Sequence, residues 1–124
     1  RALLLPFQRN LISNYQKKNH VIVEGRDIGT IVCPNADLKL FMTTSPKVRA
    51  IRRLKQLGKI DITKEDLNKM VTEISQRDQQ DKSRLNAPLV QDKDALLFDT
   101  GEKNLNDTVK EFINIISNKL SITK

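Results

Sequence analysis

The sequence predicts an α/β fold, with short parallel strands joined through helices. Three short apolar runs are typical of strands: Val21–Val23, residues 38–43 and residues 95–99. A cationic helical excursion separates the second run from the third, and another helical pattern follows the third. Strands separated by helices favour a parallel sheet over a set of hairpins.

The individual elements follow from local patterns. Apolar residues recur at helical spacing over residues 1–18, although Pro6 lies near the start. Ser45 and Pro46 form a cap and first-turn pair for a helix over 47–57. A further helix begins at Thr63, where Asp66 completes an imperfect capping box. An amphipathic helix over 104–120 closes the chain.

The composition of the 124 residues restricts the class of partner. Lysine and arginine number 22 against 15 acidic residues, which gives a net charge of +7 and favours a polyanion: nucleic acid, a phospholipid surface or a phosphate ester. Four Phe, one Tyr and no Trp argue against a base-stacking platform for single strands. One cysteine excludes an intrachain disulfide. No run is long enough to span a membrane, and we expect a cytoplasmic protein.

The stretch VIVEGRDIGT, residues 21–30, is the clearest candidate site. A buried strand is expected to end in Glu24, Gly25, Arg26 and Asp27, and ligands bind at the carboxyl ends of strands in open α/β sheets. An arginine beside carboxylates can hold a phosphate next to a metal ion. The alternative is a turn that contains an Arg–carboxylate pair.

Arginines recur near predicted strand ends and on the excursion. Arg77, Asp81 and Arg84 would share one face of a continuing helix, for which a solvated, salt-bridged face is the alternative. Phosphoryl transfer requires positioning and charge neutralisation, which arginines, a Mg²⁺-binding carboxylate and a mobile lid would supply. The phosphate-cradling motif GxxxxGK[ST] does not occur in the sequence.

Three segments together resemble the C-terminal portion of bacterial cytidylate kinases, which transfer a phosphoryl group from ATP to CMP or dCMP. They are VEGRDIGTIVCPNADLKLFMTTSPKVRAIRR, QRDQQDKSRLNAPL and ALLFDT. The resemblance implies the P-loop nucleoside monophosphate kinase fold, a three-layer α/β/α arrangement around a parallel sheet. In it, residues 1–45 and 85–124 would belong to the core. Residues 46–84 would form an arginine-rich helical lid and a CMP-facing helix.

The resemblance also assigns residues to the acceptor nucleotide. Arg26 would contact the CMP phosphate, Asp27 would lie near the cytosine amino group, and Arg1 would help to recognise the base. Arg77 and Asp81 would hold the pentose, with the carboxylate accepting from ribose hydroxyls. Arg84 would contact the base or the phosphate of the nucleotide.

The lid and the metal follow from the same resemblance. Arg49, Arg52 and Arg53 would close over the phosphates of ATP and, with Arg26 and Asp27, make up the expected catalytic set. Mg²⁺ is the expected cofactor, with ATP as co-substrate. Many family members carry Asp where this chain has Glu24, whose longer side chain can still reach a Mg²⁺-bound water.

The chain begins at Arg1 inside a helical pattern, and the family's P-loop and CMP-binding insert have no counterpart in it. We therefore expect a fragment that is inactive alone and is free to pair with itself or with the missing half, or to be partly disordered. The complete enzyme is expected to be a monomer. Two alternatives remain open: a basic nucleic-acid-binding module that uses the cationic face of residues 47–55, and a kinase of the same fold for another phosphate ester. The interleaved acids of residues 77–84 argue against nucleic acid.

Overall fold

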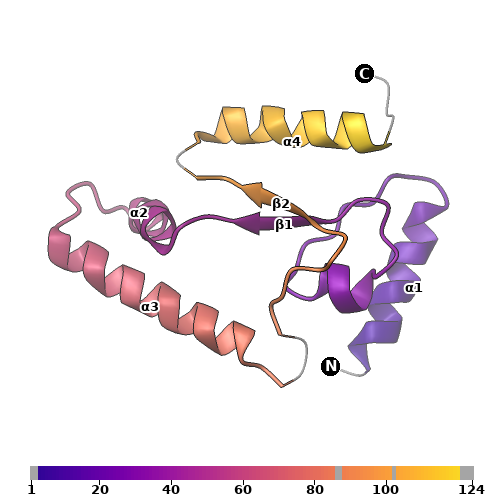
Figure 1. The fold of residues 1–124 in the computed structure, drawn as a ribbon, viewed down its shortest axis with the longest axis horizontal. Helices are drawn as coiled ribbons and strands as arrows, with labels where there is room; N and C mark the ends of the chain where they lie inside the picture. The colour runs from indigo at the N-terminus through magenta and orange to yellow at the C-terminus, as the bar shows by residue number, and fades with distance from the viewer. Residues whose placement is uncertain (1–2, 86–87, 102, 121–124) are drawn as a thin grey trace.

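The computed structural model describes residues 3–85, 88–101 and 103–120. Helices precede, separate and follow two short strands along this part of the chain (Figure 1). Their order is α1 (Leu4–Gln16), a π-helical turn η1 (Ile28–Val32), β1 (Leu40–Thr43), α2 (Pro46–Gln56), α3 (Lys64–Lys82), β2 (Leu96–Asp99) and α4 (Leu105–Leu120).

The two strands form a parallel pair, which confirms the predicted strand direction. Leu40 lies opposite Leu96 and Thr43 opposite Asp99, and the crossover between the strands contains α2 and α3. Both arrows point toward α2 in Figure 1, whereas α1 and the η1 turn lie beyond the other end of the pair. The carboxyl ends of both strands therefore lie on the side of the arginine-rich helix.

One helix packs against the sheet. α4 runs beside β2, and the Phe98 and Phe112 rings meet with their centroids 6.2 Å apart (Figure 1). Met42 and Leu97, on opposite faces of the pair, are each 61% exposed. Because parallel sheets are normally covered on both faces, the described residues provide only part of the expected three-layer arrangement.

The helix starts agree with the caps read from the sequence. The Val48 amide donates to Ser45 Oγ at 3.3 Å, with Pro46 in the first turn of α2. At the start of α3 the Asp66 amide donates to Thr63 Oγ1 at 3.1 Å, and the Thr63 amide donates back to the Asp66 carboxylate at 3.3 Å. Asp66 thus completes a full capping box, which fixes where α3 begins.

The expected strand over Val21–Val23 is wrong. Residues 20–24 have no regular secondary structure, and Ile22 is 79% exposed. A strand requires a hydrogen-bonded neighbour, and none lies beside this segment in the described part of the chain. The η1 turn that follows was not predicted. It forms because the Val32 amide donates to the carbonyl of Asp27, five residues earlier, at 3.1 Å.

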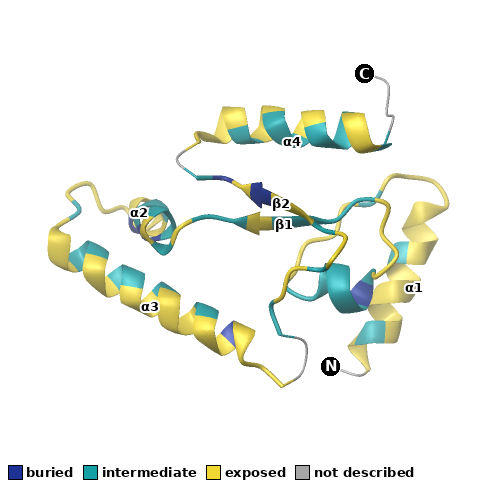
Figure 2. Cartoon of the chain, viewed as in Figure 1, coloured by how far each residue is buried: buried dark blue, intermediate teal, exposed yellow. Residues whose placement is uncertain are grey.

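The buried residues in the described part of the chain are few and are spread over several elements (Figure 2). The apolar ones are Val32, Ala50, Leu54 and Phe98. Two polar residues are also buried: Asp81 is 2% exposed and Thr100 is 6% exposed. Both are bound by arginines, as described below. Among the described residues, no helix combines the length and apolar character required to cross a membrane.

Candidate nucleotide site

A buried carboxylate near the end of α3 organises the candidate site. The Arg26 guanidinium donates from Nη1 to Asp81 Oδ1 at 2.9 Å, and Arg84 Nη2 lies 2.8 Å from the same oxygen. The Asp81 side chain is 3% exposed, whereas those of Arg26 and Arg84 are 38% and 44% exposed. The two arginines therefore cover the carboxylate while each keeps a face toward solvent.

The main chain around Asp81 explains how the helix end is placed. α3 ends at Lys82, and the Leu89 amide donates to the Asp81 carbonyl at 3.0 Å. The chain thus folds back onto the last turn of α3, close to the carboxylate. Arg26 belongs to the turn that precedes η1, which is distant from α3 in the sequence.

The glycine before Arg26 lies in a crowded turn. A Cβ built on Gly25 would lie 2.7 Å from Ile28 Cγ1, so a larger residue would have to displace that side chain. Asp27 is half-buried, and its carbonyl accepts from the amides of Ile31 and Val32 at 2.9 and 3.1 Å. Hydrogen bonds thus hold the backbone at Asp27, and Gly25 leaves room for the Ile28 side chain.

Arg77, the predicted partner of Asp81 at the pentose, is not joined to this cluster in the described part of the chain. Arg77 is exposed, and no hydrogen bond or ion pair joins it to Asp81 in the described part of the chain. Arg1 lies outside the described residues. Of the predicted acceptor-site residues, the structure joins Arg26, Asp81 and Arg84 directly.

The first arginine of α2 binds α3. Arg49 donates through both terminal nitrogens to the two Asp78 carboxylate oxygens, with Nη1 to Oδ1 at 2.9 Å. This hydrogen-bonded pair raises the pKa of Arg49 and lowers the pKa of Asp78 from their ordinary values. Asp78 was not singled out from the sequence, although its place three residues before Asp81 puts it on the same helix face.

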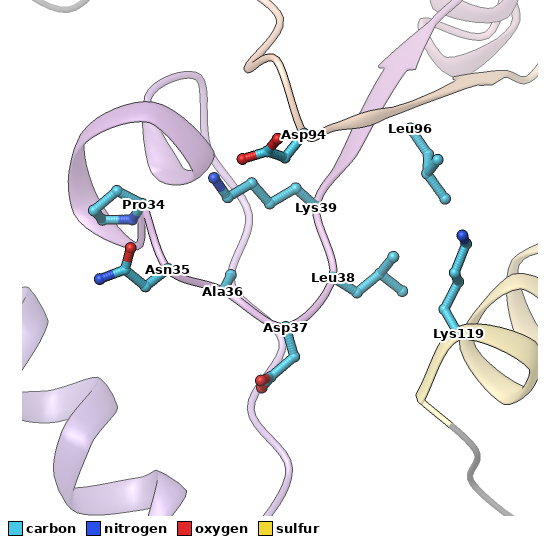
Figure 3. Close-up of a pocket in the computed structure, with 9 residues that line it drawn as sticks. All are labelled: Pro34, Asn35, Ala36, Asp37, Leu38, Lys39, Asp94, Leu96 and Lys119. Atoms are coloured by element: carbon cyan, nitrogen blue, oxygen red, sulfur yellow. The ribbon is translucent and has the colours of Figure 1, made fainter.

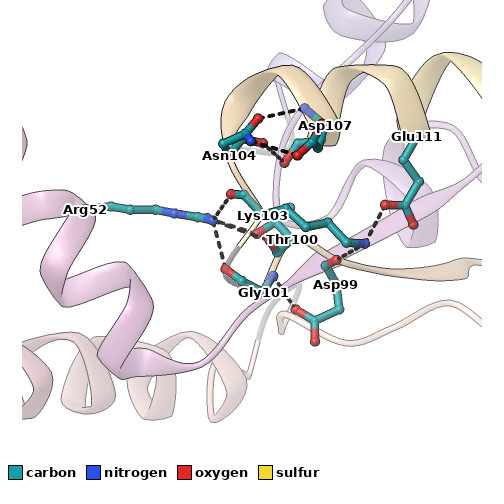
Figure 4. A network of polar contacts seen from close by, with 9 residues as sticks. Arg52, Asp99, Thr100, Gly101, Lys103, Asn104, Asp107 and Glu111 are labelled. Atoms are coloured by element: carbon teal, nitrogen blue, oxygen red, sulfur yellow. Dashed lines mark hydrogen bonds and ion pairs between the residues drawn. The ribbon is translucent and has the colours of Figure 1, made fainter.

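The second arginine of α2 binds the turn after β2 (Figure 4). Arg52 Nη1 donates to Thr100 Oγ1 at 3.0 Å, and Nη2 donates to the Gly101 carbonyl at 2.9 Å. The carbonyls of Thr100 and Lys103 lie 3.4 and 3.3 Å from Nη2. In contrast, Arg53 is exposed and makes no hydrogen bond or ion pair within the described ranges.

The described residues do not form a metal site of their own. No group of three or more His, Cys, Asp or Glu side chains is placed to hold a metal ion in the part of the chain that the structure describes. Glu24 is exposed in the turn before Arg26. A single carboxylate fits a Mg²⁺ ion only as one ligand of an ion bound mainly by nucleotide phosphates.

A pocket of about 340 Å³ lies at the opposite ends of the strands (Figure 3). It is lined by residues 34–39 together with Asp94, Leu96 and Lys119. Lys39 is nearly buried and lies 3.1 Å from the Asp92 carboxylate. The Asp94 amide and Lys39 hold the pKa of Asp92 below its usual value. The pocket precedes β1 and β2, and none of its lining residues belongs to the cluster of Arg26, Asp81 and Arg84.

A short parallel sheet with an arginine-rich helical excursion at its carboxyl end is an α/β arrangement, the class of fold in which ligands bind at the carboxyl ends of the strands. The cytidylate kinase family model matches residues 4–118. The chain therefore belongs to the cytidylate kinase family.

Relatives agree with this family. The cytidylate kinase of Rickettsia felis is 45% identical over 114 residues, which are 90% of this chain and 50% of that protein. The cytidylate kinase of Rickettsia prowazekii is 44% identical over 115 residues, or 90% of this chain and 51% of that protein. The chain spans about half the length of the curated relatives that it matches.

Proposed function

We propose that this chain forms part of a nucleoside monophosphate kinase that transfers the γ-phosphoryl group of ATP to CMP or dCMP, with Mg²⁺ as cofactor. The observation that carries the proposal is the meeting of Arg26 and Arg84 on the buried carboxylate of Asp81. Two partly exposed guanidinium groups around one fixed carboxylate can bind a phosphate and a sugar hydroxyl side by side.

The proposed roles use the hydrogen-bond donors and acceptors that this cluster leaves unoccupied. Arg26 binds Asp81 through Nη1 and retains other donors for the phosphate of CMP. Both arginines bind Oδ1 of Asp81, so a ribose hydroxyl would donate to Oδ2. Because the Asp81 side chain is 3% exposed, Arg84 must turn aside to admit the sugar. Arg77, which is unpartnered in the described residues, would then close on the pentose.

Asp27 is proposed to recognise the cytosine amino group, and Arg1 to assist at the base. A carboxylate accepts from the amino group of cytosine but has no such partner on uracil, so it would favour CMP over UMP. Lid helix α2 would face the ATP phosphates, and its Arg53 guanidinium has no partner among the described residues. Glu24 would meet Mg²⁺ through water. Phosphoryl transfer in such a site relies on positioning and on neutralising the phosphate charge.

We further propose that this chain alone is inactive. The sequence has no GxxxxGK[ST] motif, so it does not contain the backbone loop that would surround the β- and γ-phosphates of ATP. The proposed site needs the other half of the kinase fold to supply that loop. Met42 and Leu97 are exposed on the two faces of the sheet. The other half of the fold would cover these apolar side chains, or isolated chains would associate through them. The complete enzyme is proposed to be a cytoplasmic monomer.

The nucleic-acid alternative is less favoured. Of the cations on α2, Arg49 and Arg52 are bound to Asp78 and to the turn after β2. Counterion release on nucleic acid requires cations that are free to meet successive phosphates. Binding that collapses steeply with salt and ignores the base would favour this alternative.

The proposal is tested by assaying CDP formation from CMP and ATP–Mg²⁺. The purified 124-residue chain should form none, and detectable CDP would contradict the proposed inactivity. In a complete cytidylate kinase that contains these residues, Arg26→Ala and Asp81→Ala should each abolish most activity while circular dichroism remains unchanged. Near-normal turnover and CMP affinity in either folded variant would show that its assignment is wrong.

A further inference from the structure

The three arginines of α2 have different surroundings. Arg49 is paired with Asp78 of α3, and Arg53 is exposed without an internal partner among the described residues. Arg52 extends toward the turn after β2, where its two terminal nitrogens meet a hydroxyl and three main-chain carbonyls at 2.9 to 3.4 Å. The same helix thus carries one arginine bound to the core, one bound to its neighbouring helix, and one open to solvent.

We propose that Arg52 is a positioning residue, which anchors lid helix α2 to the turn after β2 and leaves Arg53 to meet the phosphates of ATP. This inference rests on the proposed function for the identity of the phosphate. In this proposal Arg52 acts by binding the turn after β2 and does not contact ATP directly.

The acceptors of Arg52 explain why it would remain in place. Thr100 is 6% exposed, so its hydroxyl has little access to water as a substitute for the guanidinium. If Arg52 swung onto a nucleotide, the buried Thr100 hydroxyl would lose the guanidinium as its donor, and a buried acceptor left unpaired is costly. A planar guanidinium can serve several acceptors at once, which a lysine ammonium on the same helix would do less well.

The turn itself is built to hold these carbonyls in place (Figure 4). The Gly101 amide donates to Asp99 Oδ1 at 2.8 Å, and the Lys103 amide donates to the Thr100 carbonyl at 3.1 Å. Gly101 has a φ of 38°, in the left-handed region that favours glycine. The Lys103 ammonium also binds Glu111 of α4. Arg52 therefore connects α2 to a turn that is fixed to both β2 and α4.

Hydrogen exchange tests the anchor. In the 124-residue chain, Arg52→Gln should accelerate exchange of the Gly101 and Lys103 amides by roughly tenfold, because a charge-assisted contact that closes the turn is lost. Arg53→Gln is the matched control from the same helix and should leave both amides unchanged. Unchanged exchange in Arg52→Gln would overturn the proposal. If that variant does not fold, Arg52→Lys is compared with Arg53→Gln in the same exchange measurement. Lysine keeps the positive charge but lacks the planar guanidinium.

Titration with inorganic tripolyphosphate at low salt tests the different roles of Arg52 and Arg53. With arginine side chains labelled for NMR, the Arg53 signals should shift and the Arg52 signals should not. Arg53→Gln should abolish binding at unchanged stability. Arg52→Gln and Thr100→Val alter the two ends of one contact, so each should weaken binding several-fold, and the double variant should be no weaker than Arg52→Gln alone.

The opposite pattern would overturn the proposal. It consists of Arg52 signals that shift with tripolyphosphate, together with unchanged affinity in Thr100→Val. Absence of tripolyphosphate binding in the unaltered chain would also contradict it. A parallel titration with CMP separates the two proposals, since CMP binding without tripolyphosphate binding contradicts only the role of α2. Failure of CMP binding contradicts the acceptor site of the proposed function.

Discussion

The Arg26 guanidinium binds the Asp81 carboxylate at 2.9 Å, although the two residues are 55 positions apart in the sequence. Arg26 belongs to the turn before η1, and Asp81 to the last turn of α3. This contact joins two segments that the sequence could only suggest as partners. It also gives the buried carboxylate a cation, without which its burial would be costly.

Replacing the buried carboxylate should destabilise the chain. Asp81→Asn keeps the side-chain volume but removes the charge that Arg26 and Arg84 share. Because both arginines retain access to water, we expect a loss of about 1–3 kcal/mol in the free energy of unfolding, measured with urea. Asp61→Asn is the control, since its exposed carboxylate has no partner among the described residues, and it should change stability little. Equal stability of the two variants would contradict this account of Asp81.

The cap of α3 gives a second prediction. Thr63→Ala removes the hydroxyl that accepts from the Asp66 amide and should cost about 1 kcal/mol in unfolding free energy, with an unchanged denaturant m value. Thr72→Ala is the matched control. Its hydroxyl donates to the Asn68 carbonyl within the helix, where alanine is a better helix former, so the change should be neutral or slightly stabilising. A Thr63→Ala variant as stable as Thr72→Ala would rule out the cap.

Stability should fall in acid through the same cap. Hydrogen bonds from Lys59 and Thr63 lower the pKa of Asp66 to about 2, below the value of about 4 expected in an unfolded chain. A carboxyl with a lowered folded pKa contributes its full stabilisation above the unfolded pKa and loses it as the pH falls. Arg49 likewise lowers the pKa of Asp78.

The measurement is the free energy of unfolding of the unaltered chain and of Asp66→Asn between pH 5 and about pH 2. The difference between the two chains should be largest above about pH 4 and should shrink toward about pH 2, as Asp66 becomes protonated in the folded state. A difference that is independent of pH would contradict the lowered pKa.

The helix starts that the sequence predicted have local causes. Ser45 and Thr63 mark the starts of α2 and α3 because capping is decided within four residues. The strand expected at Val21–Val23 failed because a strand depends on a neighbour elsewhere in the chain. Its β-branched residues favour extended structure, but they do not provide a neighbouring strand.

The contacts within the candidate site likewise depend on residues that are distant in the sequence. The sequence grouped Arg77, Asp81 and Arg84 by helical spacing, yet in the structure Asp81 pairs with Arg84 and with the distant Arg26. The contact of Arg52 with the turn at Thr100 spans 48 residues, and no local pattern distinguishes Arg52 from its neighbour Arg53. Charged residues can be recognised in a sequence, whereas their partners depend on tertiary structure.

The central claim is that this chain carries half of a CMP site, and nucleotide titration tests it most directly. Amide signals of the isotopically labelled chain should shift with CMP at residues 25–30 and 81–84, and Arg26→Ala should remove those shifts. UMP should bind more weakly, because uracil offers no amino group to a carboxylate at the base site. If CMP shifts none of these signals, or if UMP binds equally well at the same residues, the claim is contradicted.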